Sequence, residues 1–141
     1  MATAIESVLS QDFKTFELIF VNDGSTDNSL MIAESFSKND ARIRLFSRPN
    51  GGLNSARNYG AKRAADNSEA LLFFDADDIL EKNMIASLYH ELKSGSNVGA
   101  AYCNYKCMDT NGIKLKKENN SRRLIPTKFW FKDLPITEKT T

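Results

Sequence analysis

Two acidic groups in the sequence follow apolar runs, and their side chains suit a divalent cation. Asp23 follows the run 17–21, and Asp75 and Asp77 follow the run 70–74. Since these two aspartates are two residues apart, an extended backbone would project both carboxylates to the same side. Mg²⁺ and Mn²⁺ prefer such oxygen ligands and share them with substrate phosphates. The alternative is a solvated acidic turn that favours the start of the next helix.

A glycine-rich loop followed by an arginine is the second candidate. Residues 50–60 read Asn-Gly-Gly-Leu-Asn-Ser-Ala-Arg-Asn-Tyr-Gly, so the glycines precede a predicted helix with Arg57 in its first turn. Free backbone N–H groups at a helix start can face an anion, and Arg57 could add a charge-assisted contact to a phosphate. The loop matches neither the Walker A nor the G-x-G-x-x-G pattern. A plain helix-entry loop with Arg57 on the surface is the alternative.

Apolar runs alternate with helical spacing along the chain, and these elements must position the candidate residues. The predicted strands are 17–21, 42–46, 70–74 and 98–105, and the predicted helices are 30–36, 55–65 and 84–92. The runs 17–21 and 70–74 are nearly continuous, which is typical of strands buried on both faces. The alternation predicts an α/β fold with a mainly parallel sheet. In such folds ligands bind beyond the carboxyl ends of the strands, where the aspartates lie.

The length and charge of the chain exclude several classes of function. A chain of 141 residues fits one domain with a real core. Hydrophobic residues make up 41% and charged residues 26%, and the net charge of +1 implies no field-driven attraction to nucleic acid. No apolar run reaches membrane-spanning length, and the first residues do not form a signal peptide. We therefore expect a cytoplasmic protein, with peripheral membrane contact left open.

Several other residues invite a functional interpretation that their context does not favour. Cys103 and Cys107 are too few for a disulfide framework and lack C-x-x-C spacing, so we expect buried or half-buried free thiols. His90 is the single histidine and is expected on an exposed helix face. Asn111-Gly112 predicts a hairpin turn. The aromatic segment 128–132 is either a core element or a contact to a membrane or a lipid-linked acceptor.

Taken together, the motifs resemble family 2 glycosyltransferases of the GT-A fold. The matching stretches are 4–11, 16–27, 50–60 and 71–78. They keep the order and spacing of that family over about the first 95 residues. The resemblance implies a single partial GT-A domain over residues 1–141. Its donor-binding half would extend to about residue 105, and the incomplete start of an acceptor half would follow from about residue 106.

The resemblance also implies a role for each candidate residue. Asp23 would accept a hydrogen bond from the base of the donor, and Arg57 would lie near the base or the diphosphate. Asp75 and Asp77 would form the D-x-D motif that binds Mn²⁺ or Mg²⁺, with Asp77 the main metal ligand and Asp75 nearer the ribose. The metal would neutralise charge on the departing nucleoside diphosphate. Asn22 stands where the family usually has a first aspartate.

The implied activity is transfer of a sugar from a nucleotide donor, a UDP-sugar above all, to a saccharide or lipid-linked acceptor. The reaction would be inverting, with one direct displacement, and would belong to polysaccharide biosynthesis. The family's central first strand and its acidic catalytic base have no counterpart in the sequence, so no base is assigned. We therefore expect the chain alone to be inactive and, with strand edges unpaired, prone to self-association.

Two other functions are compatible with some of the residues. A non-catalytic nucleotide-binding remnant would keep the donor-binding residues and lack the base. A phosphatase of the haloacid dehalogenase type also carries D-x-D after a buried strand, and its first aspartate is a nucleophile. That motif normally sits on the first strand, whereas here it follows the third predicted strand, so the sequence disfavours the phosphatase.

Overall fold

The computed structural model describes residues 1–95, 98–109 and 129–130 of the chain. The elements, in chain order, are α1 (Ala2–Leu9), β1 (Leu18–Asp23), α2 (Ser29–Ser37), β2 (Ile43–Arg48), α3 (Leu53–Ala61), β3 (Leu71–Leu72), α4 (Met84–Lys93) and β4 (Phe129–Trp130). Helices and strands alternate from α1 to α4, which confirms the predicted α/β class.

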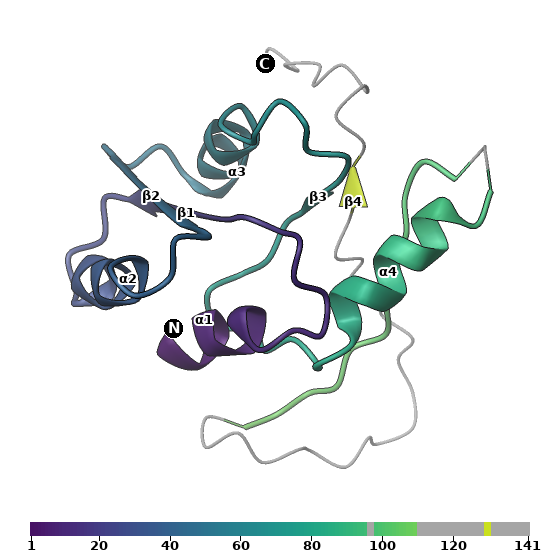
Figure 1. The fold of residues 1–141 in the computed structure, drawn as a ribbon. Coiled ribbons are helices and arrows are strands. Elements are labelled where there is room, and N and C mark those ends of the chain that lie inside the picture. Colours follow the sequence, from purple (N-terminus) through teal and green to yellow (C-terminus); the bar gives the residue numbers. More distant parts are fainter. Residues whose placement is uncertain (96–97, 110–128, 131–141) are drawn as a thin grey trace.

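Strands β1 and β2 are parallel neighbours joined through α2. Their register pairs Leu18 with Ile43 at the start and Asp23 with Arg48 at the end. Helices α1 and α2 cover one face of this pair, and α3 covers the other (Figure 1). The carboxyl ends of both strands therefore open at the same edge, where the loops leading to α2 and α3 begin.

Alternate residues of β1 pack against different helices. Leu18 and Phe20 contact the buried cluster around Ile5 and Ala33, on the side of α1 and α2. On the other side, a Cβ built at Gly60 would lie 3.2 Å from Val21 Cγ2, so α3 rests directly on the strand. Both faces are covered as predicted, yet these side chains stay half-buried. The reason is that no other described strand pairs with the second edge of β1.

The predicted strands at 70–74 and 98–105 differ most from the structure. β3 contains only Leu71–Leu72 and pairs antiparallel with Phe129–Trp130, so the parallel pairing in the described residues is that of β1 with β2. Over 98–109 the structure has no extended strand. Instead Ala101 packs beside Leu88 and Leu92 of α4, because an apolar run without a strand partner buries its side chains against the nearest helix.

Helix α3 begins at Leu53 and ends at Ala61, so it starts and stops earlier than the predicted 55–65. Glu17 explains the early end, because its carboxylate accepts the Ala65 N–H at 2.6 Å and an Arg44 N–H at 2.7 Å. Burial raises the pKa of Glu17, but these hydrogen bonds outweigh it and leave the pKa below its ordinary value. Glu17 therefore ties the start of β1 to β2 and to the chain that follows α3.

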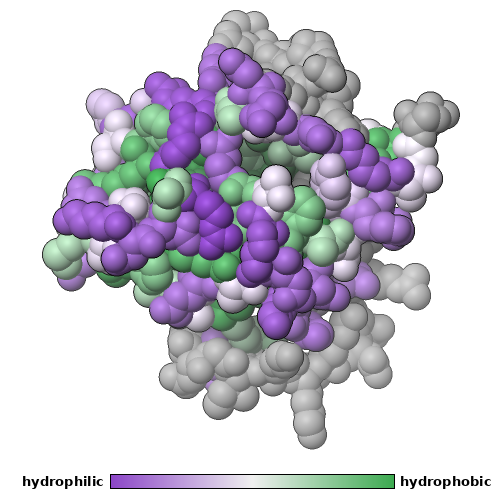
Figure 2. Space-filling model, in the orientation of Figure 1, coloured by the Kyte–Doolittle hydropathy of each residue, from purple (hydrophilic) through white to green (hydrophobic). Residues whose placement is uncertain are grey.

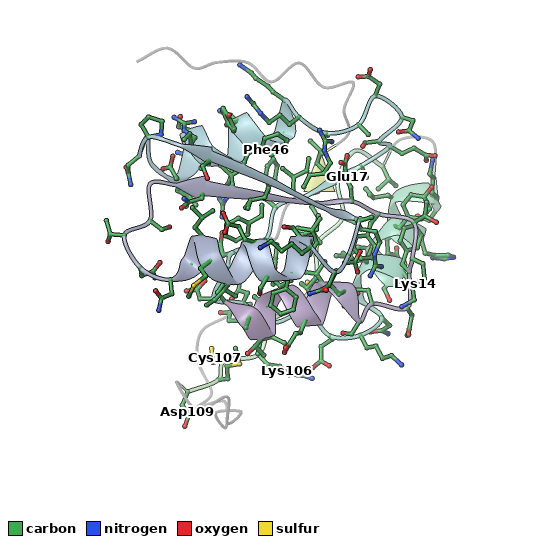
Figure 3. The ribbon with its side chains drawn as sticks, turned by 60° about the vertical axis from the view of Figure 1, so that its left-hand side comes forward. Lys14, Glu17, Phe46, Lys106, Cys107 and Asp109 are labelled. Atoms are coloured by element: carbon green, nitrogen blue, oxygen red, sulfur yellow. The ribbon has the colours of Figure 1, made fainter. Side chains whose placement is uncertain are left out.

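The remaining predicted side chains lie away from the strand ends. Cys103 is half-buried, as expected, and burial raises the pKa of its thiol, whereas Cys107 is exposed, which contradicts the prediction. Figure 3 shows Cys107 on the segment below α1, far from Phe46 of β2. His90 is exposed on α4, as predicted. The hairpin at 111–112 lies outside the described residues, and none of the helices described is long and apolar enough to cross a membrane.

Candidate functional site

Asp23 holds the glycine-rich loop through its own carboxylate. The Gly51 N–H donates to both carboxylate oxygens at 3.0–3.1 Å, and the Gly52 N–H donates to Oδ2 at 2.8 Å. Arg48 Nε, opposite Asp23 in the strand register, lies 3.1 Å from Oδ1. We expected the loop amides to bind an external anion. They instead donate to the Asp23 carboxylate, which is an anion of the protein itself.

The two neighbours of Asp23 in the sequence, Asn22 and Gly24, shape the turn after β1. Asn22 is buried, and its Oδ1 accepts the Ser25 N–H at 3.0 Å, so this side chain shapes the turn after β1. Gly24 has a φ of 76°, and a Cβ there would stand 2.9 Å from the backbone nitrogen of Asn50. The loop after β1 and the loop before α3 thus pack backbone against backbone, which only glycine permits at position 24.

Arg57 joins α3 to the acidic segment. Its Nη2 donates to Asp75 Oδ1 at 2.6 Å, and both side chains are partly exposed. Because α3 starts at Leu53, Arg57 lies in the second helical turn instead of the predicted first. The ion pair brings together two residues that the sequence separates by 18 positions. One is the predicted phosphate-side cation and the other is the first aspartate of the D-x-D.

The segment that carries the D-x-D is a turn and not an extended strand end. The Asp78 N–H donates to the Asp75 carbonyl at 3.1 Å, and the chain reverses through Ala76 and Asp77. The prediction that Asp75 and Asp77 project to the same side of an extended backbone is therefore wrong, because strand periodicity does not apply within a turn. Asp75 is half-buried beside Arg57, whereas Asp77 is exposed.

Asp78 is a third carboxylate at this turn, and the sequence reasoning gave it no role. Partial burial raises the pKa of Asp78, and the negative charges of Asp77 and Asp75 raise it further. The three carboxylates therefore lie close enough to repel one another electrostatically, and the turn carries a high density of negative charge. The signal that could have identified Asp78 was present, because three of four consecutive residues are acidic.

The acidic turn fits a divalent cation that is completed by a ligand. No group of three or more His, Cys, Asp or Glu side chains among the residues described is arranged to hold a metal alone. Mg²⁺ in nucleotide sites is commonly held by one or two carboxylates together with substrate phosphates, so such a group is not required. Asp77 is exposed with its oxygens free of hydrogen bonds to described residues, while one oxygen of Asp75 faces Arg57. These two residues could hold the cation.

A large cavity lies between β1 and β3, with a volume of about 860 Å³ and a mostly apolar lining. Three of the four predicted site residues, Asp23, Arg57 and Asp75, contribute to its wall. Asp77, in the turn itself, does not line the cavity. Figure 2 shows apolar surface interleaved with hydrophilic side chains on this face of the molecule. The site is thus a polar rim on an apolar hollow, a common form of small-molecule site.

Comparison with known proteins decides the family. The sequence matches the description "Glycosyl transferase family 2" over residues 1–140. The chain belongs to glycosyltransferase family 2. Glycosyltransferase GlyG of Streptococcus pneumoniae is 37% identical over 114 residues, which are 79% of this chain and 37% of that protein. The cholesterol galactosyltransferase of Borreliella burgdorferi is 34% identical over 135 residues, which are 96% of this chain and 34% of that protein.

A comparison with solved structures supports the fold. S. aureus TarS, residues 1–349, aligns with a TM-score of 0.68 and 26% sequence identity, covering 92% of this chain and 42% of that one. The α/β architecture of this chain is that of the GT-A fold. The chain spans about a third of the length of the GlyG and galactosyltransferase relatives. Membership of family 2 leaves the phosphatase alternative without support.

Proposed function

We propose that this chain forms the donor site of a glycosyltransferase that moves a sugar from a nucleoside diphosphate, a UDP-sugar, to a saccharide or lipid-linked acceptor. The observation that carries the proposal is the Arg57–Asp75 ion pair, on the wall of the cavity that Asp23 also lines. It joins a phosphate-binding type of side chain to the acidic turn at the carboxyl ends of the strands, where α/β folds bind ligands.

Each residue would have a separate task in donor binding. Asp23, already bonded to the loop amides, would present the loop and its remaining acceptor capacity to the base. Arg57 would contact the base or the diphosphate, and Asp75 would face the ribose. Asp77, with Asp75, would hold Mn²⁺ or Mg²⁺ together with the phosphates. When bound, the cation would neutralise charge on the departing diphosphate and so make it a better leaving group.

The proposal extends to the whole chain in outline. Residues to about 105 would form the donor-binding half, and residues from about 106 would begin the acceptor half. The displacement would be direct and inverting, in polysaccharide biosynthesis, at a cytoplasmic location with peripheral membrane contact. The catalytic base stays unassigned. A non-catalytic nucleotide-binding protein would share the donor site and differ only in lacking transfer.

Calorimetry with UDP, with and without MnCl₂, tests the donor site. We expect UDP to bind in the presence of Mn²⁺ and Asp77→Asn to weaken this binding about tenfold, a loss typical of a perturbed metal site. Glu6→Gln, which neutralises an exposed carboxylate of α1, should change nothing. Equal UDP affinity in the Asp77→Asn and unchanged proteins would overturn the metal assignment.

Transfer is tested separately, with UDP-glucose as donor. We expect the 141-residue chain to bind the donor without releasing UDP, because no acidic side chain in a recognisable base context has been assigned. The assay measures UDP formed over hours at high protein concentration. UDP release that disappears in Asp77→Asn would show that the chain turns over its donor at this site, which would contradict the expectation.

A further inference from the structure

A buried glutamine connects α1 to the chain that follows the acidic turn. Gln11 has 0% of its surface exposed, although its side chain is polar. Its Oε1 accepts the Ile85 N–H at 3.0 Å, and its Nε2 donates to the Glu81 carbonyl at 2.8 Å and to the Ser7 carbonyl at 3.0 Å. The amide therefore uses both its N–H donors and its oxygen, as a buried polar group must.

Ser7, on the last turns of α1, lies next to Gln11, which follows the end of that helix. Its Oγ accepts the Leu80 N–H at 3.1 Å and donates to the Ala4 carbonyl at 2.7 Å. A backbone bond from the Asp12 N–H to the Lys82 carbonyl, at 3.0 Å, continues the contact. We call Ser7, Gln11 and the backbone of 80–85 the Gln11 cluster. It joins parts of the chain about 70 residues apart.

The position of the Gln11 cluster beside the acidic turn gives it a functional meaning. Leu80, the first residue held, is separated from Asp78 by Ile79 alone. At its other end the turn is held by the ion pair of Asp75 with Arg57. The turn is therefore fixed on both sides, by α3 before it and by α1 after it. Hydrogen bonds set this position in a way that apolar contacts alone would not, because they are directional.

We propose that Gln11 is a positioning residue for the acidic turn, setting where Asp77 stands relative to Arg57. The inference rests on the proposed metal role of the turn and names the residue that orients it. Gln11 does not touch the cation or the nucleotide. It acts through the backbone of Glu81 and Ile85, in the way that outer hydrogen bonds orient metal ligands in general.

Two substitutions separate the roles of the amide. Gln11→Met keeps the length of the side chain and removes its three hydrogen bonds. Gln11→Glu keeps an oxygen for the Ile85 N–H but loses both donors and turns a carboxylate toward two carbonyls. Ile43→Val is the matched control, because Ile43 is buried in the cluster between β1, α1 and α2. That substitution lowers stability without touching the turn.

Two measurements follow each variant at a temperature well below its unfolding transition. One is amide hydrogen exchange, which needs no ligand. It follows Ile85, whose N–H donates to Gln11, and Leu80, whose N–H donates to Ser7 of the same cluster. The other is the ratio of UDP affinities with and without MnCl₂. In Gln11→Met we expect faster exchange at these amides, and in both Gln11 variants we expect a fall of about tenfold in the ratio. Ile43→Val should lower stability and leave the ratio unchanged. If Gln11 served stability alone, its variants would behave like Ile43→Val and leave the ratio unchanged too.

The outcomes separate this inference from the function on which it rests. Faster exchange with an unchanged ratio would overturn the positioning role, and unchanged exchange would overturn the contact itself. If the unchanged protein binds UDP equally with and without Mn²⁺, the proposed metal function fails. The exchange of Leu80 and Ile85 would then still decide whether Gln11 holds the turn.

Discussion

Several carboxylates among the described residues meet an arginine that lies far from them in the sequence. Asp23 meets Arg48 and two loop amides, Glu17 meets Arg44, and Asp75 meets Arg57. Asp77 differs, since it has no such partner among the described residues. Its carboxylate is therefore available to the cation of the proposed donor site.

Asp40 gives the clearest expected pH effect. Hydrogen bonds from the Arg42 side chain and backbone lower the pKa of Asp40 from 3.8 to about 2. Because the folded pKa lies below the ordinary value, this stabilisation is complete above about pH 4 and is lost as the pH falls toward 2. Denaturant unfolding at pH 3 and pH 6 measures it, and Asp40→Asn should reduce the difference between the two.

The control for this effect is Glu34→Gln, an exposed carboxylate on α2. It should leave the difference between pH 3 and pH 6 close to that of the unchanged protein. An equally large change in both variants would mean that general charge, and not the Asp40–Arg42 contact, controls the acid response.

Several site residues could be predicted from sequence because each follows an apolar run or a glycine loop. Asp23, Arg57 and Asp75 lie together on one cavity wall, as strand-end reasoning expects. Arg48 could not be found in this way, because its relation to Asp23 depends on the register between two strands. Gln11 was also missed, since its importance arises from contacts to residues about 70 positions away.

At the scale of elements, the loops after β1 and β2 act as one unit. The turn after Asn22 and the loop before α3 contact through Gly24 and Asn50. Gly51 is similarly close, because a Cβ there would meet the guanidinium of Arg48. Backbone contacts thus shape the end of the sheet, and the charged side chains of Asp23 and Arg48 lie around it.

Gly24→Ala tests this contact. We expect a loss of about 2 kcal/mol in the free energy of unfolding, because alanine disfavours the positive φ and its Cβ would clash with Asn50. Urea denaturation measures the loss. Gly52→Ala isolates the cost of the positive φ, since nothing lies within 4 Å of its Cβ.

Gly99→Ala completes the series, because position 99 has open space and no positive φ. We expect little change there. A Gly24→Ala protein as stable as Gly99→Ala would show that the loops can separate, which would contradict the close packing of the two turns.

The shortened strand β3 shows where local sequence is insufficient. Residues 70–74 are as apolar as 17–21, yet only Leu71–Leu72 form a strand. A strand needs a partner that supplies hydrogen bonds, and local composition does not reveal which partner is available. The helices were easier to predict, because their bonds are internal and their apolar spacing is visible, as the agreement of α4 with 84–92 shows.

At the scale of the whole molecule, the main feature of the described residues is the cavity between the β1–β2 sheet and the β3–β4 sheet. Ile19 and Val21 line it from β1, and Phe73 and Phe74 line it from the chain after β3. Buried cores lie to either side, one around Ala33 and one around Leu88. The described part of the chain is therefore held together by a buried cluster on each side of the cavity. The edge of β1 that no described strand pairs with borders this cavity.

We expect the chain to self-associate through this region, with a second copy covering the apolar wall. Sedimentation velocity over a wide range of protein concentrations should show the mean sedimentation coefficient rising with concentration, since unpaired strand edges promote association. The rise should persist in 0.5 M NaCl, at about a 4–5 Å screening length, because the contact is apolar. A single monomeric species at every concentration would contradict this expectation.

Gly60 gives α3 its closeness to β1, and this has a consequence for how the site can vary. Arg57 precedes Gly60 by about one helical turn, so the distance of the helix from the strand also sets the reach of the guanidinium. Any side chain at position 60 would push against Val21 and move Arg57 outward. A residue with no side chain thus helps to fix where the Arg57–Asp75 ion pair forms.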